Sequence, residues 1–393
     1  MADRIERSEV LGYDRRVKSS LGSALFGLVL FAAAFPLHFW NEGRAVAESQ
    51  ALAEGAGAVV EAEAMPLDPG KEGRLVHVIA RASAGQPVVD PQFGLTQPAL
   101  ALERQVEMYQ WREHKEKRRE KQLGGSEKEI TTYTYDKGWI DRPLDSTRFA
   151  EPAGHANPGR FPFESQRFEA EPVRLGDFVV APELARQIDG SEPLPVKPDA
   201  LPPNLAVSFQ ADEGALITST DRAHPQVGDL RVRFERVPEQ MVSVIGLQRN
   251  GRIEPYTTSN GRSIALVERG EVPAARLFQA AEHRNGVLTW LLRGAGFVLM
   301  WIGLAAALGW IGTAFDVLPF LGSLVQRGIG IVAGLAAAAL SAVTVAIAWL
   351  FHRPLVGIGL LLIAGLALLT LRRRTRPPPP PPGPVAPPPP PVG

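Results

Sequence analysis

The sequence predicts an α+β membrane protein in which four transmembrane helices, one N-terminal and three C-terminal, anchor a β-rich extracytoplasmic domain. Two observations carry this prediction. Four apolar stretches of the 393-residue chain contain no Asp, Glu, Lys or Arg, and much of the region between the first and second alternates in the manner of β-strands. About 20 apolar residues at 1.5 Å per residue span the roughly 30 Å hydrocarbon core of a bilayer. A soluble protein with four such core helices is the disfavoured alternative.

The apolar stretches set the domain boundaries. We expect transmembrane helices at residues 21–40, 287–315, 328–351 and 354–371. The β-rich domain then occupies residues 41–286, and residues 316–327 form a cytoplasmic or interfacial loop. A secretory signal cleaved near Ala45-Val46-Ala47 is the alternative for the first stretch, but that stretch is longer than an ordinary signal and Arg44 lies between it and the cleavage site.

Positive charges predict the orientation. The N-terminus (1–20) is basic, and the tail (372–393) opens with arginines before it becomes polyproline. Four spans place both termini on one side, so we expect both in the cytoplasm. Arg293, near the outer end of the second span, can snorkel to the interface. Trp349 suits an interfacial aromatic belt.

Within the domain, alternating residues predict strands. The segments are 73–80, 102–111, 129–135, 230–234, 241–248, 253–257 and 263–267. Asn250-Gly251 between two of them is a strong hairpin signal. The mixed-charge run 114–129 reads as a solvated hairpin loop. Two glycine-led runs, GRLVHVIA and GDLRVRF, suggest two related β-modules.

Helical composition flanks the domain at both ends. The residues from Ala45 to Val60 are rich in Ala and Glu and are expected to form a helix along the membrane after the first span. The segment from Val272 to Arg284 is expected to be a helix that leads into the second span.

Composition argues against several classes of function. The chain has 42 basic and 42 acidic residues, which gives no reason to expect nucleic acid as a partner. It contains no cysteine, so disulfides and thiolate metal sites are excluded. The seven histidines are scattered without metal-ligand spacing, and no catalytic motif is present. We therefore expect no catalytic residues, no cofactor and no metal.

Small residues recur at four-residue spacing within the predicted spans. The pairs are Ser23 and Gly27, Gly303 and Ala307, and Gly330 and Gly334. This spacing puts each pair on one helix face, where backbones can approach closely, either within a chain or between chains. Asp316 is the one carboxylate near the last three spans and is a possible functional acid, although a position at headgroup level is favoured.

The first predicted span ends in Asn41, Glu42, Gly43 and Arg44. Glycine at this point could end the helix as it leaves the bilayer. Glu42 and Arg44 could pair with each other or with lipid headgroups. A structural role, in which this membrane-exit motif fixes how the domain docks on the membrane, is favoured over ligand binding.

A string of motifs in this order resembles the transmembrane protein 43 (LUMA) family. The motifs that carry the resemblance are NEGRAV at 41–46, EGRLVH at 72–77, VEMYQW at 106–111, HANP at 155–158, VGDLRV at 227–232 and WLFHRPL at 349–355. The resemblance implies a polytopic endomembrane protein without known catalytic residues. Animal members lie in the endoplasmic reticulum and inner nuclear membrane, self-associate, and partner lamins and emerin. This chain departs from them in its polyproline tail and its lack of cysteine, and its composition looks bacterial, so those partners are not carried over.

We therefore expect a non-enzymatic membrane scaffold that contacts the lipid bilayer and forms homo-oligomers. A bacterial inner membrane is the expected location, with the endoplasmic reticulum or nuclear envelope as the eukaryotic alternative. Two other functions stay open: a pore or channel subunit, and an envelope-stress sensor whose tail recruits a polyproline-binding cytoplasmic protein.

Overall fold

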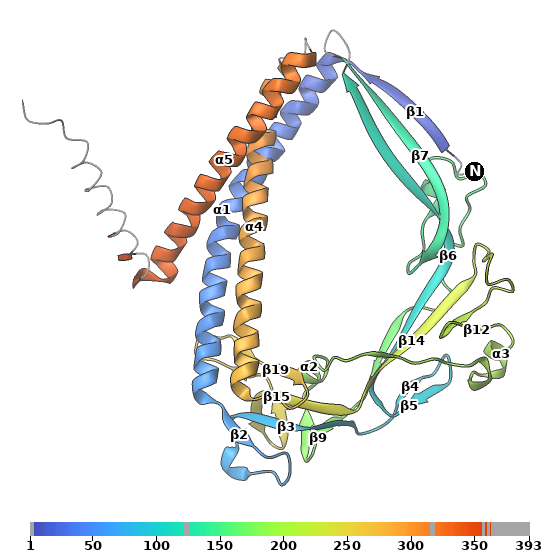
Figure 1. The fold of residues 1–393 in the computed structure, drawn as a ribbon, viewed down its shortest axis with the longest axis vertical. Coiled ribbons are helices and arrows are strands. Elements are labelled where there is room, and N and C mark those ends of the chain that lie inside the picture. Colours follow the sequence, from blue (N-terminus) through green and yellow to red (C-terminus); the bar gives the residue numbers. More distant parts are fainter. Residues whose placement is uncertain (1–3, 122–125, 315–318, 356–357, 360–361, 363–393) are drawn as a thin grey trace, which may run out of the picture.

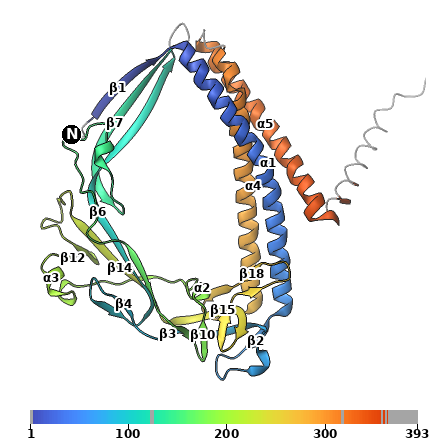
Figure 2. The ribbon, with the colours of Figure 1, turned by 180° about the vertical axis from the view of Figure 1, so that it is seen from behind.

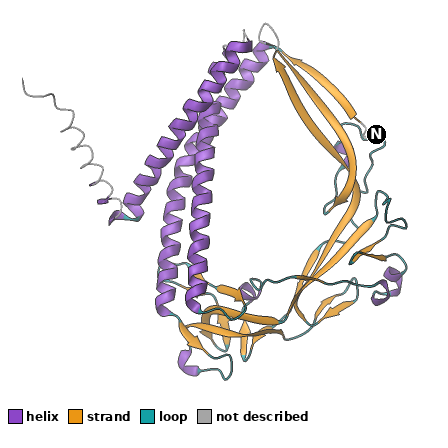
Figure 3. Cartoon of the chain, in the orientation of Figure 1, coloured by secondary structure: helices purple, strands orange, loops and turns teal. Residues whose placement is uncertain are grey.

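The computed structural model describes residues 4–121, 126–314, 319–355, 358–359 and 362. Three long helices stand together: α1 (Tyr13–Ala58), α4 (Ala274–Ala314) and α5 (Pro319–His352). Each contains a segment long and apolar enough to cross a membrane. The β-rich domain starts at one end of α1 and α4 and curves back toward the other end (Figure 1). Figure 2 shows the same closed outline from behind, and Figure 3 shows that the long helices and the strands occupy separate sides of it.

Helix α1 is much longer than the predicted span and runs unbroken through Gly43 to Ala58. Two expectations were therefore wrong: Gly43 does not end the helix, and residues 45–60 do not form a separate helix along the membrane. A glycine inside a helix costs only about 1 kcal/mol relative to alanine. The contacts that α1 makes with both neighbouring helices outweigh that cost.

Helices α4 and α5 also extend beyond the predicted boundaries. Helix α4 joins the expected leading helix and the second span into one element. Helix α5 begins at Pro319, so most of the predicted loop 316–327 is helical. Proline is well tolerated in the first helical turn because its missing N–H would have no partner there. The predicted span 354–371 lies mostly outside the described residues, and Asp316 and the tail 372–393 lie entirely outside them.

The larger sheet has the strand order β1-β7-β6-β14-β13-β12, with β8 beside β6 and β11 beside β14. Its strands are β1 (Arg4–Leu11), β6 (Ala99–Lys121), β7 (Glu127–Ile140), β8 (Gln166–Glu169), β11 (Glu192–Pro193), β12 (Gln210–Asp212), β13 (Ala215–Ile217) and β14 (Leu230–Pro238). The pairing of β6 with β7 continues to Lys121 opposite Glu127. The charged run 114–129 is therefore mostly strand, and its prediction as a loop was wrong.

Opposite charges support this long hairpin. Lys117 and Arg119 of β6 both contact Glu129 of β7, at 2.6 and 2.9 Å. Because their side chains meet across the two strands, the charges stabilise the pairing instead of opposing it. The mixed composition that indicated a solvated loop is equally suited to a solvated hairpin.

The smaller sheet closes on itself, because the pairings β3-β15-β16-β10-β9 return to β3. Its strands are β2 (Val60–Ala62), β3 (Leu75–Ala84), β9 (Val173–Leu175), β10 (Phe178–Val180), β15 (Gln240–Arg249), β16 (Arg252–Glu254) and β19 (Leu266–Arg269). Asn250 and Gly251 have φ values of 51° and 71°, so the predicted hairpin turn is confirmed. The two glycine-led runs belong to β3 and β14, which lie in different sheets, so the expectation of two related β-modules is not confirmed.

The remaining elements are short. Strands β4 (Val88–Asp90) and β5 (Leu95–Gln97) form one small sheet, and β17 (Tyr256–Thr257) and β18 (Ser263–Ile264) form another. The short helices are α2 (Pro182–Ala185), α3 (Pro203–Ala206), and the 3₁₀ turns η1 (Pro69–Lys71), η2 (Ser146–Arg148) and η3 (Pro198–Ala200). In the domain core, the buried Arg104 donates to both carboxylate oxygens of buried Asp90, at 2.8 and 2.7 Å.

Strand β1 pairs with β7 along its whole length, from Arg4 opposite Thr134 to Leu11 opposite Glu127. Strand β1 precedes α1 in the chain, and β7 follows it. Two strands that are hydrogen-bonded along their whole length cannot lie on opposite sides of a bilayer. The pairing therefore does not fit the expectation that residues 1–20 and 41–286 are separated by the membrane.

Candidate functional site: a buried polar network between the three long helices

The three long helices share one carboxylate, that of Glu42 in α1. Arg293 of α4 donates from Nε to Oε1 at 2.6 Å and from Nη2 to Oε2 at 2.8 Å. The indole N–H of Trp349 in α5 donates to Oε2 at 2.7 Å. Only 2 % of Glu42 is exposed. This carboxylate therefore links all three helices at one level.

The geometry compensates for the cost of burying these charges. Removing an ion from water costs several kcal/mol, which is recovered only when its hydrogen bonds are fully made. The planar guanidinium of Arg293 matches the two carboxylate oxygens of Glu42. Its central carbon also lies 4.7 Å from the ring centroid of Trp290 and 5.7 Å from that of Trp349. Either charge left alone here would be strongly unfavourable.

A second group of hydrogen bonds joins α1 and α4 beside this ion pair. Arg44 donates to Asn285 Oδ1 at 3.0 Å and to Thr289 Oγ1 at 2.9 Å. Asn41 donates to the Thr289 carbonyl oxygen at 3.1 Å, and Asn285 donates to the Ala45 carbonyl oxygen at 3.0 Å. Together they connect side chains and backbone along a full turn of both helices.

Two glycines allow histidine rings to enter the bundle. A Cβ at Gly43 would lie 2.8 Å from the ring of His352, and one at Gly296 would lie 2.6 Å from the ring of His38. The His38 ring nitrogen Nε2 is 3.2 Å from the Ser341 hydroxyl. Gly43 is therefore a contact residue between α1 and α5, and its role is to admit a neighbouring side chain.

All four residues of the predicted membrane-exit motif contribute to the network, but with different partners from those expected. Glu42 pairs with Arg293 and not with Arg44. Arg293 and Trp349 both donate hydrogen bonds to Glu42 within the bundle. The sequence motifs singled out above did not include Asn285 and Thr289. Their four-residue spacing, continued at Arg293, marks a polar stripe on one face of an apolar helix and could have revealed them.

The predicted helix-packing residues in α1 and α4 meet within the chain. A Cβ at Gly27 would lie 2.6 Å from the carbonyl oxygen of Gly303 and 2.7 Å from the backbone nitrogen of Ala307. The two helices are therefore in backbone contact here. Ser23, one turn earlier, lines a hollow together with Ala306.

The small residues in α5 serve a similar contact with α4. The indole N–H of Trp301 donates to the Gly330 carbonyl oxygen at 2.8 Å. A Cβ at Gly334 would lie 3.2 Å from the same indole nitrogen. The absence of a side chain at Gly334 leaves room for the indole ring between the helices, whereas Gly330 contributes only its carbonyl oxygen, since a Cβ there would meet nothing within 4 Å.

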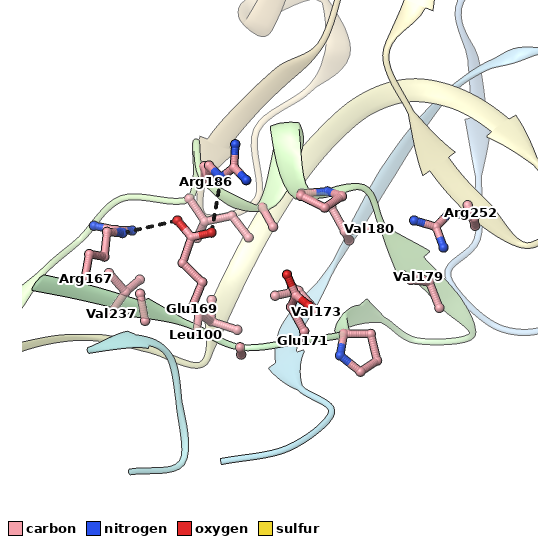
Figure 4. A pocket seen from close by; sticks show the side chains of 16 residues that line it. Leu100, Arg167, Glu169, Glu171, Val173, Val179, Val180, Arg186, Val237 and Arg252 are labelled. Atoms are coloured by element: carbon pink, nitrogen blue, oxygen red, sulfur yellow. Dashed lines mark hydrogen bonds and ion pairs between the residues drawn. The ribbon is translucent and has the colours of Figure 1, made fainter. Parts of the chain in front are cut away.

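A separate hollow of about 360 Å³ lies in the β-rich domain (Figure 4). Its rim carries Arg167 and Arg186, which contact Glu169 at 3.6 and 3.1 Å. Glu169 therefore partly compensates both arginine charges, and Glu103 also contacts Arg167 at 3.7 Å. Among the residues that the structure describes, no group of three or more His, Asp or Glu is arranged to hold a metal ion.

A buried tyrosine stands at the root of the long hairpin. The Tyr135 hydroxyl donates to Glu113 Oε2 at 2.8 Å and accepts from the Glu151 backbone N–H at 3.0 Å. Its ring stacks on His155 with centroids 3.9 Å apart. Burial, together with the Glu113 carboxylate, raises the pKa of Tyr135 to about 12. The phenol is therefore held neutral and cross-links β6, β7 and the loop that follows them.

These features define an integral membrane protein whose long helices are joined by a buried ionic network and carry a β-rich domain. Comparison with known proteins assigns the family. The family model "Transmembrane protein 43" matches residues 108–354, and the chain belongs to this family. It is 34 % identical to human transmembrane protein 43 over 93 % of this chain and 92 % of the human protein.

Other animal relatives cover a similar part of the chain. Rat transmembrane protein 43 is 34 % identical over 88 % of both chains. The transmembrane protein 43 homolog of Drosophila melanogaster is 31 % identical over 86 % of this chain and 91 % of its own length. No solved structure matches this chain.

Breaking the central ion pair should destabilise the helix bundle. We expect Glu42→Gln or Arg293→Gln to cost about 3–5 kcal/mol, because each leaves the other charge buried without a partner. The double variant should lose less unfolding free energy than the sum of the losses in the two single variants. Thermal unfolding in a mild detergent measures this, with the exposed Arg118→Gln as the control. Additive losses would contradict a coupled pair.

The raised pKa of Tyr135 predicts alkaline sensitivity. A group whose pKa is higher in the folded state contributes fully below its unfolded pKa of about 10, and its contribution is lost as the pH rises through about 12. Tyr135→Phe should be less stable at neutral pH but should lose less stability across this window. Denaturant midpoints within and below the window measure the difference, with Tyr133→Phe as the control. An equal loss of stability across this pH window in Tyr135→Phe and wild type would refute the raised pKa of Tyr135.

Proposed function

We propose that this protein is a non-enzymatic membrane scaffold, which holds its β-rich domain in a fixed pose at the bilayer and self-associates to organise the membrane or its protein complexes. One observation carries the proposal: α1 and α4 continue out of their apolar segments into the domain as unbroken helices. There, Leu52 of α1 and Leu277 and Phe278 of α4 pack with Ile245 and Ile264 of the domain.

The rigid connection distinguishes a scaffold from a tethered domain. A flexible linker lets a domain sample many orientations, so that its surfaces are not presented in a defined direction. Here two helices enter the domain together, and Glu42 and Arg293 tie them to each other just before they do. A surface of the domain is therefore presented to partners at a defined orientation relative to the bilayer.

Self-association is assigned to the domain and not to the small-residue faces. Gly27, Gly303 and Gly334 already have contacts within the chain. The larger sheet, in contrast, ends in β1 on one side and β12 on the other, and no further strand of the described residues pairs with either. An open strand edge is a template for a strand of another copy.

The proposal also includes the membrane in which the protein lies and the role of its proline-rich tail. The proline-rich tail from residue 377 onward is proposed to lie in the cytoplasm, as a ligand for an aromatic-lined groove of a partner protein. The relatives from human, rat and fruit fly are eukaryotic proteins, which supports an endomembrane location, and a bacterial cell membrane is the alternative that the composition of the chain suggests.

Spin labels can test the rigid connection, since the chain has no native cysteine. Labels at Ser208→Cys in the domain and Arg327→Cys in α5 should give a narrow distance distribution in nanodiscs. Phe278→Ala should broaden it, because removing a buried phenylalanine costs about 3–5 kcal/mol of packing. Mass measurement of the same nanodiscs should find more than one copy. A strict monomer in nanodiscs and in several mild detergents would refute the scaffold.

A second candidate function, a pore subunit, is favoured by one observation. Strands β1, β7 and the end of β6 stand at the same height as the apolar parts of the long helices (Figure 1). They carry many charges, among them Arg7, Lys117 and Glu129. Lipid cannot surround such strands, because each unsatisfied backbone group there costs several kcal/mol. Water at membrane depth, enclosed by several copies, would accommodate them.

Cysteine pairs test the second candidate. Ser8 lies opposite Ile130, so Ser8→Cys with Ile130→Cys should form a disulfide within one chain in membranes. Ser8→Cys with Thr134→Cys, four residues further along β7, is the control and should not. Lys117→Glu should alter conductance in planar bilayers. Labelling of positions 8 and 130 from opposite sides of the membrane would exclude the pore.

A further inference from the structure

A hollow of about 810 Å³ lies beside the buried network, between α1, α5 and a loop of the domain. Its apolar part is formed by Phe35, Phe39 and Trp40 of α1, at the end of the predicted first span. Trp40 is 57 % exposed, as expected for a ring at the boundary between hydrocarbon and headgroups. The hollow therefore begins at acyl-chain depth and ends where headgroups lie.

The polar end of the hollow is positively charged. Arg44 of α1 and Arg262 of the loop between β17 and β18 both line it. The hydrogen-bond acceptors of Arg44, on Asn41, Asn285 and Thr289, are all uncharged. Among the described residues, the Nε–H of Arg44 has no hydrogen-bond partner.

The positive charge of Arg262 is only weakly compensated by neighbouring carboxylates. The nearest carboxylate paired with it is that of Glu48, at 3.7 Å, and 38 % of the Arg262 side chain is exposed. The backbone around Arg262 is held firmly, because Asn260 donates to the Ala47 carbonyl oxygen at 2.7 Å and Ser259 donates to Glu54. Glu48 lies near both arginines and compensates their charges only in part, so an anion at the opening would relieve the remaining repulsion.

The shape of the hollow depends on Gly43. The His352 ring occupies the place that a side chain at position 43 would take, and it lies 4.9 Å from the ring of Phe39. His352 Nε2 has no hydrogen-bond partner among the residues that the structure describes. The hollow therefore combines an aromatic wall, a polar ring nitrogen and two arginines.

We infer that this hollow binds one anionic phospholipid of the adjacent leaflet, with its phosphate between Arg44 and Arg262 and an acyl chain against Phe35 and Phe39. Guanidinium groups are well suited to phosphate oxygens, which they can bind through two parallel hydrogen bonds. Basic pockets between membrane helices are suited to lipid headgroups. Phosphate and hydrocarbon together, on one molecule, match the two ends of this site.

Nanodiscs of phosphatidylcholine, with and without phosphatidylglycerol, test the site. Phosphatidylglycerol should raise the unfolding midpoint of the full chain, because a ligand that binds only the folded state stabilises it. Arg262→Gln should weaken binding about tenfold or more, the loss expected for one charged hydrogen bond. Arg276 is exposed and lies away from the hollow. Arg276→Gln removes the same charge, and phosphatidylglycerol should still raise its unfolding midpoint as much as that of wild type.

Three outcomes would overturn the inference. The first is an equal reduction of the phosphatidylglycerol stabilisation in Arg262→Gln and Arg276→Gln, which would indicate general attraction to a charged surface. The second is stabilisation by inorganic phosphate in phosphatidylcholine nanodiscs, which would indicate a free-phosphate site. The third is the absence of any phosphatidylglycerol effect on wild type. Phe39→Ser provides a second variant, whose loss of the lipid effect would follow from the apolar half of the site alone.

Discussion

The structure depends on the need to satisfy one buried carboxylate. Glu42, Arg293 and Trp349 come from three segments far apart in the chain, and none of the three polar groups is stable in an apolar bundle alone. Their interaction is complete only when α1, α4 and α5 are in register. Lipid-facing helices gain little from hydrophobic association with each other, so such polar contacts and close packing decide how they assemble. The pose of the domain follows, because α1 and α4 continue into it.

The features that could be predicted from the sequence are those set by local composition. The apolar segments in α1, α4 and α5 were evident because the absence of charge over about 20 residues has one common explanation. The turn at Asn250-Gly251 was evident because two consecutive positive φ values favour these residue types. The membrane-exit motif was recognised as structural, and its four residues do lie in the network.

The partners of those residues could not be predicted, because they are set by tertiary contacts. Nothing local to Glu42 indicates Arg293, which lies 251 residues away. The continuity of α1 through Gly43 was missed for the same reason: glycine is an ordinary helix terminator, and only the His352 ring explains why it stands inside this helix. The hairpin of β6 and β7 is longer than expected. Opposite charges on the two strands pair with each other, as Lys117 of β6 does with Glu129 of β7, and a run of mixed charge does not by itself indicate such pairing.

Arg44 connects the network to the proposed lipid site. It donates to Asn285 and Thr289 of α4 and also lines the hollow beside α5. Its position on α1 is therefore determined by protein contacts on one side, while its charge remains without a carboxylate partner among the described residues. A phosphate at this point would add charge compensation to a helix interface that is already assembled. The same interface orients the domain, so lipid composition and domain orientation would be linked through one guanidinium group.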